Sequence, residues 1–183
     1  MKNNKQLPRS TKFLLTLAND LLKHTFNTTD AFLFSCGSAK ILASRLNMTN
    51  RQYYSALDSF RRHGYIKRVN TDQFLITPKA ITHARIAKID SGNWENQSWD
   101  GSWKLIAFDI PEKRRSERDM FRSLLKRKGF VGLQNSVFIS PFADFKELAL
   151  LRRDLKIEKH VSFFVAKSHQ SDDDSALRKR FGL

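Results

Sequence analysis

The sequence predicts an α+β protein made of two small domains. At 183 residues the chain is longer than a typical single domain, which holds about 100 to 150 residues. Apolar residues in the first half are spaced as in amphipathic helices, whereas the second half alternates short apolar strands with helices. With 40% hydrophobic residues, among them 15 Phe, the chain has enough apolar surface for two cores.

Three helices are predicted at the start of the first half. Residues 13–22 place their apolar side chains on one helical face, and residues 38–46 form a second segment of this kind. A third helix begins after Thr49 and ends at Gly64. Gln52 stands three residues after Thr49, which is the spacing of a capping box at a helix N-terminus.

A hairpin follows these helices. Residues 65–69 and 73–76 have the composition of two short strands, and the residues between them favour a turn. A further helix is predicted over residues 78–89, with a proline at its start. Helix, helix, tight turn, helix and hairpin is the order of a winged helix-turn-helix, in which the hairpin forms the wing.

The second half has a different order of elements. The predicted elements are a strand over 103–108, a helix over 111–128, strands over 130–133 and 136–140, a helix over 145–155 and a strand over 160–166. This is the order of a ferredoxin-like βαββαβ domain. We therefore predict a winged helix-turn-helix domain over 1–90, a linker over 91–102, a ferredoxin-like domain over 103–170 and a tail over 171–183, which is expected to be a loose helix.

The charge of the chain points to a polyanionic partner. There are 33 Lys and Arg residues against 18 Asp and Glu, a net charge of +15. Residues 1–90 hold 15 of the basic and only 5 of the acidic side chains. Clustered basic side chains displace counterions from phosphates, so double-stranded DNA is favoured over the two alternatives, a merely soluble cationic surface and a binder of anionic membranes.

Several classes of protein are disfavoured. Cys36 is the single cysteine, so neither an intrachain disulfide nor a cysteine-based zinc cluster can form. The five histidines lack a metal-binding spacing, and there is no glycine-rich phosphate loop, so we expect no cofactor, no metal and no enzyme activity. No secretion signal and no apolar run of about 18 residues is present, which predicts a cytoplasmic protein without a membrane span.

Two blocks in the second half resemble a known family. Residues 99–115 (WDGSWKLIAFDIPEKRR), followed by Gly129-Phe130 and residues 133–141 (LQNSVFISP), resemble the middle of PaaX-type repressors, which regulate phenylacetate catabolic operons. The same core is similar to the CRISPR adaptation nuclease Cas two. The resemblance implies DNA binding and a homodimer. Members carry a further C-terminal domain that this chain is expected to lack, so their acyl-CoA response is not carried over and no small-molecule effector is assigned.

The third helix is the candidate for reading DNA. Asn50, Arg51, Tyr54, Ser55 and Asp58 are predicted on its outward face. Arg51 can bond a guanine edge with two hydrogen bonds, and Asn50 or Gln52 an adenine, unless the capping box occupies Gln52. The predicted DNA-contacting residues are Lys40, Thr49, Asn50, Arg51, Gln52, Tyr54, Ser55, Arg61, Arg62, Lys67 and Arg68, the last four as phosphate contacts. The alternative is a solvated basic helix in a winged helix that binds protein.

Asp109 matches the aspartate of the adaptation nuclease. One carboxylate at a strand end supplies too few oxygen ligands for a metal unless a dimer brings in its twin. We therefore expect Asp109 to be structural: it would accept the free amides of the following helix, and Arg114 and Arg115 would hold its charge.

Two further features of the second half have structural interpretations. The basic residues of the helix over 111–128 form either a second phosphate-binding face or, as slightly favoured, a solvated helix side. Trp94, Trp99 and Trp103 surround the linker and are expected to pin the two domains together.

The sequence as a whole predicts a transcriptional repressor that binds a palindromic operator as a homodimer, with residues 91–183 sufficient for dimerisation because sheet edges must be paired or covered. Two alternatives stay open. One is a Cas-two-like metal-dependent nuclease, or CRISPR adaptation subunit, with an added DNA-reading domain. The other is an architectural DNA binder without sequence preference.

Overall fold

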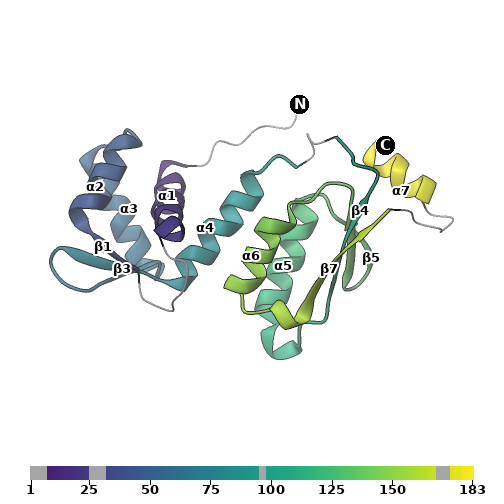
Figure 1. Ribbon diagram of the computed structural model, residues 1–183. Coiled ribbons are helices and arrows are strands. Elements are labelled where there is room, and N and C mark those ends of the chain that lie inside the picture. Colours follow the sequence, from purple (N-terminus) through teal and green to yellow (C-terminus); the bar gives the residue numbers. More distant parts are fainter. Residues whose placement is uncertain (1–7, 25–31, 95–97, 168–173) are drawn as a thin grey trace. The chain divides into compact units, whose positions relative to one another are not determined.

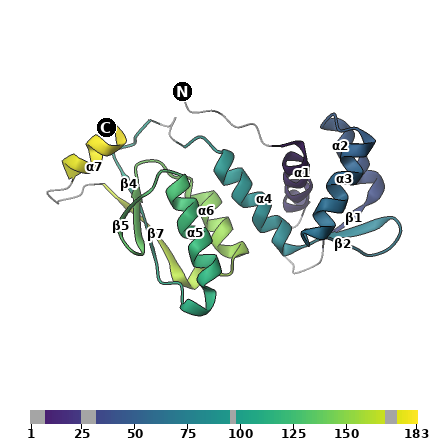
Figure 2. The same ribbon diagram turned by 180° about the vertical axis from the view of Figure 1, so that it is seen from behind.

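The computed structural model describes residues 8–24, 32–94, 98–167 and 174–183. The chain divides into two compact units, Met1–Ser91 and Gly92–Leu183. Both contain helices and a sheet, so the α+β prediction is confirmed (Figures 1 and 2). Among the described residues, no helix combines the length and the apolar character that crossing a bilayer requires.

The first unit joins four helices to a three-stranded sheet. Its elements are α1 (Arg9–His24), β1 (Phe32–Ser35), α2 (Cys36–Arg45), α3 (Asn50–Arg62), β2 (Ile66–Arg68), β3 (Gln73–Ile76) and α4 (Pro78–Ser91). The strands are antiparallel in the order β1-β3-β2. The predicted helices and the β2–β3 hairpin are present, whereas β1 was not predicted. It pairs along β3, from Phe32 opposite Ile76 to Ser35 opposite Gln73.

Local signals fix where α2 and α3 begin and end. The Ser35 side chain accepts a hydrogen bond from the Ser38 amide at 3.0 Å and caps α2 directly after β1. Asn47 leaves the helical conformation with a φ of 53°, and α3 starts three residues later. At its other end, Gly64 has a φ of 70°, which glycine adopts without steric cost. The chain then turns into β2.

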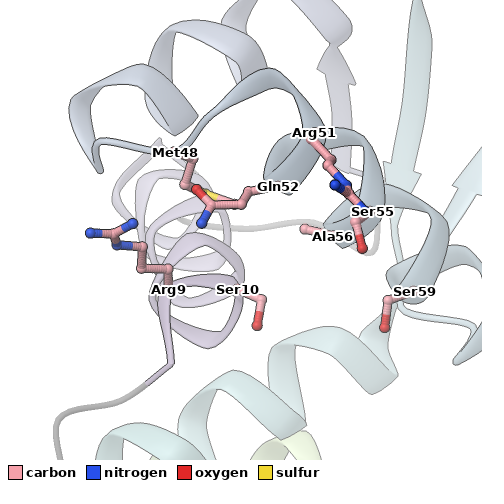
Figure 3. A pocket seen from close by; sticks show the side chains of 8 residues that line it. All are labelled: Arg9, Ser10, Met48, Arg51, Gln52, Ser55, Ala56 and Ser59. Atoms are coloured by element: carbon pink, nitrogen blue, oxygen red, sulfur yellow. The ribbon is translucent and has the colours of Figure 1, made fainter.

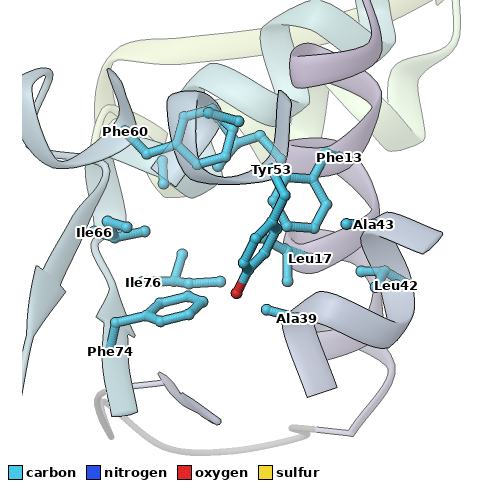
Figure 4. Packing of buried hydrophobic residues seen from close by; sticks show 13 residues of the cluster. Phe13, Leu17, Ala39, Leu42, Ala43, Tyr53, Phe60, Ile66, Phe74 and Ile76 are labelled. Carbon is cyan, nitrogen blue, oxygen red and sulfur yellow. The ribbon is translucent and has the colours of Figure 1, made fainter. Parts of the chain in front are cut away.

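An aromatic core holds α3 in place (Figure 4). The Phe13 ring from α1 lies 5.9 Å from the rings of both Tyr53 and Phe60 on α3. The Tyr53 hydroxyl donates to the main-chain oxygen of Cys36 at 3.2 Å, and burial raises the pKa of Tyr53 to about 12. Ile76 and Phe74 of β3 close the same core. Because α1, α2 and β3 pack against one side of α3, its opposite side faces outward.

The second unit contains a four-stranded antiparallel sheet in the order β5-β6-β4-β7. Its elements are β4 (Trp103–Phe108), the 3₁₀ helix η1 (Glu112–Arg114), α5 (Arg115–Arg127), β5 (Val131–Gln134), β6 (Val137–Ser140), α6 (Phe145–Asp154), the 3₁₀ helix η2 (Glu158–His160), β7 (Val161–Ala166) and α7 (Asp174–Phe181). The strands and helices follow the predicted order. The predicted helix over 111–128 begins instead as a 3₁₀ turn, and its α-helical part starts at Arg115.

The two faces of this sheet carry different side chains because neighbouring residues of a strand point to opposite sides. Phe108 of β4 lies against Phe121 of α5, with the ring centroids 5.8 Å apart. Trp103, an odd number of residues away, belongs to the other face, where it packs with Ile139 and with Leu177 of α7. Each face therefore has its own helical cover, and the α7 helix expected in the tail is packed against the sheet.

The three tryptophans lie within contacts of the second unit. Trp94 meets the Phe130 ring at 6.4 Å and the Lys128 ammonium at 4.9 Å. The Trp99 and Trp103 rings are 5.4 Å apart. These contacts lie within the second unit, and the expectation that the tryptophans pin the two domains together stays a prediction.

Candidate nucleic-acid interface

The outward face of α3 has a polar and aromatic surface. Arg51, Tyr54 and Ser55 are all exposed, and 59% of the Tyr54 surface is open to solvent. Tyr53, Ala56 and Phe60 are buried on the opposite side of the helix. An exposed tyrosine of this size, next to an arginine and on a rigidly held helix, is suited to contacting a partner.

The capping box predicted at the start of α3 is present. The Thr49 amide donates to Oε1 of Gln52 at 2.9 Å, and the Gln52 amide donates to Oγ1 of Thr49 at 3.3 Å. Both residues are exposed. The Gln52 carbonyl oxygen is occupied by this contact, so Thr49 and Gln52 both act in capping α3.

Thr49→Ala should destabilise the first unit by about 1 kcal/mol, the usual cost of losing a side-chain N-cap. The measurement is thermal unfolding followed by circular dichroism. Thr49→Ser, which keeps the hydroxyl, is the matched control. Equal midpoints for the alanine and serine variants would show that the capping box contributes no stability.

The C-terminal end of α3 carries a compact charge cluster. Asp58 Oδ1 lies 2.9 Å from Arg61 Nη2, and Asp58 Oδ2 lies 3.3 Å from Arg62 Nε. All three side chains are largely exposed, so these pairs contribute little to stability. Both guanidinium groups lie beside the Asp58 carboxylate. A phosphate would have to compete with this carboxylate for them.

Arg68, Lys67 and Lys40 are the remaining basic residues predicted to contact DNA. Arg68 donates through Nε to the main-chain oxygen of Asn70 at 3.1 Å and through Nη2 to that of Thr71 at 3.2 Å. This arginine therefore braces the turn of the β2–β3 hairpin. Lys67, on the same strand, and Lys40, on α2, are exposed.

A hollow of about 460 Å³ lies between α3 and the β2–β3 hairpin. We call it the α3–hairpin hollow. From α3 it is lined by Tyr54, Leu57, Asp58 and Arg61, and from α2, the hairpin and its turn by Cys36, Ile66, Arg68, Thr71, Asp72, Gln73 and Phe74. Its walls thus combine apolar rings with two arginines and two aspartates.

A second hollow of about 450 Å³ lies on the other side of α3, against the start of α1 (Figure 3). We call it the α1–α3 hollow. It is lined by Arg9, Ser10, Met48, Arg51, Gln52, Ser55, Ala56 and Ser59. The sequence predictions did not include Arg9 and Ser10. The only signal in the sequence is a basic residue followed by a serine ahead of an amphipathic helix, which does not show that α1 lies beside α3.

Asp109 does not have the role predicted for it. Its side chain is exposed, and its amide donates to the main-chain oxygen of His160 at 2.8 Å. The residue at the N-cap position of η1 is Pro111, and that helix start has no side-chain cap. A carboxylate two positions ahead of the proline is too far from the free amides, so the prediction of a capping Asp109 is wrong.

The two arginines expected to hold the Asp109 charge have other partners. Arg114 pairs with Glu117 at 3.2 Å and donates to the main-chain oxygens of Leu155 and Lys156. Arg115 pairs with Glu112 at 3.6 Å and Asp119 at 3.5 Å. Within the described part of the chain, no group of three or more His, Cys, Asp or Glu side chains could hold a metal ion.

Asp109→Asn should leave the unfolding free energy unchanged within about 0.5 kcal/mol, the usual range for a surface position without a special contact. Denaturant unfolding of both proteins measures this directly. A clear loss of stability in the asparagine variant would restore a structural role for the carboxylate.

Three of the basic residues along η1 and α5 make contacts within the second unit. Arg114, Arg118 and Arg122 follow one another at four-residue intervals and donate to main-chain oxygens of other segments, Arg118 to Ile110 and Arg122 to Asn135 at 2.8 Å. The Arg122 guanidinium also lies 5.9 Å from the centre of the Phe108 ring. These three arginines hold together the segments around α5, a role that neither alternative included. The choice between a solvated side and a phosphate-binding face stays a prediction for the other basic residues of this helix.

A comparison with known families identifies the second unit. Residues 96–178 match the family model described as the PaaX protein central Cas2-like domain, a range that runs from β4 into α7. No curated protein matches the chain significantly. The resemblance inferred from residues 99–115 and 133–141 is thereby confirmed. Over residues 96–178, the second unit is therefore similar to the Cas2-like domain at the centre of PaaX proteins.

Proposed function

We propose that the protein is a transcriptional repressor that reads DNA with a winged helix-turn-helix formed by its first unit. One observation carries this proposal: α3 is capped, gripped by an aromatic core, and presents Arg51, Tyr54 and Ser55 outward. A helix held in this way is what insertion into the major groove requires. The similarity of the second unit to the central domain of PaaX proteins supports the same proposal.

Each exposed residue of α3 has a defined part in this proposal. Arg51 bonds the N7 and O6 atoms of a guanine, and Asn50 bonds an adenine. Tyr54 places its ring against the groove wall. Lys40, Arg61, Arg62 and Lys67 contact phosphates and supply affinity that does not depend on sequence. Arg68 contributes by bracing the hairpin, which acts as the wing.

We propose that the second unit is a ferredoxin-like domain and that it forms the dimer. β7 is the last strand in the sheet order, so one of its edges has no strand partner within the described sheet. Phe164 and Val165 on this strand are 54% and 59% exposed. An exposed edge strand with large apolar side chains favours association with a second copy. A dimer would also match the two half-sites of a palindromic operator.

Phe164→Glu in the full chain should convert a dimer into a monomer, because two buried carboxylates would then face an apolar interface. Sedimentation equilibrium of wild type and variant at tens of micromolar, about the range where weak association is visible, gives the result. Leu133→Glu on β5, 40% exposed in the wild type, is the control and should remain dimeric. A Phe164→Glu variant that remains dimeric would place the dimer contact on another surface, and a monomeric wild type would contradict the proposed dimer.

The proposed function is tested by selecting bound duplexes from a random DNA library and titrating the selected duplex with protein, with and without magnesium. We expect tight binding and intact DNA. Metal-dependent cleavage that Asp109→Asn abolishes would make the protein a nuclease. Absence of binding to any duplex would exclude a function on DNA.

A further inference from the structure

The exposed ridge of α3 has a hollow along each of its sides. Arg51 and Ser55, which face outward, also line the α1–α3 hollow. Tyr54 and Asp58 border the α3–hairpin hollow on the other side. A helix in the major groove lies between two phosphate backbones, in a groove about 12 Å wide. In the proposed complex, with α3 in the major groove, the two hollows would face these two backbones.

The two hollows differ in charge. The α3–hairpin hollow has two arginines, Arg61 and Arg68, but also two aspartates, Asp58 and Asp72. The α1–α3 hollow is lined by two arginines, Arg9 and Arg51, without an acidic side chain among its eight residues. The α1–α3 hollow is thus the more favourable of the two for an anion.

Hydrogen-bond donors add to this charge. Ser10 comes from α1, and Ser55 and Ser59 come from α3 one turn apart, so hydroxyl groups reach the hollow from both helices (Figure 3). The Gln52 side chain also borders it, and its carbonyl oxygen is bound to the Thr49 amide. The Gln52 amide nitrogen is therefore the end available for donation. Guanidinium, hydroxyl and amide donors around one space are the usual contacts of a phosphate oxygen.

We propose that the α1–α3 hollow binds a phosphate of the DNA backbone, with Arg9 as its cationic contact and Ser10 as a neutral hydrogen-bond donor. The inference rests on the proposed function and extends it, because it adds the start of α1 to an interface so far made of α2, α3 and the hairpin. It also means that Arg51 lies between base edges and backbone.

The salt dependence of binding tests the role of Arg9. Each phosphate that a basic side chain neutralises contributes about 0.9 to the slope of log K against log salt. Arg9→Ala should therefore lower that slope by about one unit on a random-sequence duplex. Arg9→Lys keeps the charge and should retain the slope. Arg153→Ala, exposed on α6, removes the same charge from the second unit and should also leave the slope unchanged.

Ser10→Ala separates hydrogen bonding from charge. The variant should bind the same duplex several-fold more weakly, with the wild-type slope, because a hydroxyl donor is lost but no counterion release changes. Circular dichroism of each variant checks that the helix content of the chain is retained. Equal affinity of Ser10→Ala and wild type would remove this residue from the contact.

A free phosphate is the other source of the same chemistry. Thermal unfolding with and without inorganic phosphate, at constant ionic strength and without DNA, distinguishes it, since a ligand that binds the native state raises the midpoint. We expect no midpoint shift that depends on Arg9. A shift present in the wild type and absent in Arg9→Ala would assign the hollow to a small anion and overturn the backbone contact.

The outcomes separate this inference from the proposed function. Wild-type binding with equal slopes for Arg9→Ala and Arg153→Ala would overturn the inference and leave the proposed function standing. No DNA binding by the wild type would overturn both.

Discussion

Replacing Arg51 and Tyr54 together by alanine should remove most of the preference of the protein for its selected DNA site while leaving the fold intact. Both side chains are exposed on α3 and neither belongs to the core. Each lost contact costs about 1 to 3 kcal/mol, so the double variant should lose specific affinity by between about 30-fold and about ten-thousandfold. Titration of the selected duplex and of a random duplex at one salt concentration measures the change.

Two control measurements accompany this prediction. Binding of the random duplex should fall only by the share of one lost positive charge, because Tyr54 carries none. Ile41→Ala on α2, 59% exposed in the wild type, tests whether any exposed apolar residue of the helix pair has the same effect. A folded double variant that keeps the full ratio of specific to random affinity would show that α3 is not the reading helix.

Trp103→Ala should destabilise the second unit by about 3 to 5 kcal/mol, the range found when a large buried aromatic side chain is truncated. The Trp103 ring is fully buried and lies 5.4 Å from Trp99 and 5.8 Å from Phe181. Its loss leaves a cavity on the sheet face that α7 covers. The α7 helix should therefore also lose part of its docking site.

Fluorescence isolates this effect to one unit. All three tryptophans lie after residue 91, so their emission reports the second unit alone, and Trp94 and Trp99 remain in the variant. Denaturant unfolding followed by this signal gives the free energy. Leu133→Ala, at a position 40% exposed, is the control and should change stability by only about 0.5 kcal/mol. Similar losses for both variants would contradict the packing described for Trp103.

The sequence allowed prediction of elements that have strong local signals. The Thr49–Gln52 capping box and Gly64 bound α3 on both sides, and both features act within a few residues. β1 was missed because it has only four residues and passes directly into α2. What makes it a strand is its pairing with β3, about forty residues further along the chain, and such pairing leaves no periodic pattern in so short a segment.

In the candidate site, too, local patterns could be predicted from the sequence and long-range contacts could not. Helical periodicity predicted that Arg51, Tyr54 and Ser55 face outward. The exposed side of α3 follows from the spacing of apolar residues within α3 alone. The partners of Arg114 could not be predicted, since this arginine donates to main-chain oxygens some forty residues away. Asp109 was misassigned because a capping role depends on where the helix starts. The start is a 3₁₀ turn whose N-cap position is Pro111, with no side-chain cap. Arg9 could not be predicted from the sequence, because it lines the α1–α3 hollow only through the packing of α1 against α3.

The central claim is that the first unit reads a DNA sequence, and the ratio of two affinities tests it most directly. The wild-type dissociation constants for the selected duplex and for a random duplex of the same length are measured in the same buffer. The account predicts a preference of at least about a thousandfold, the lower end for sequence-specific regulators. Equal affinities for the two duplexes would contradict it and identify a binder that recognises DNA without reading its sequence.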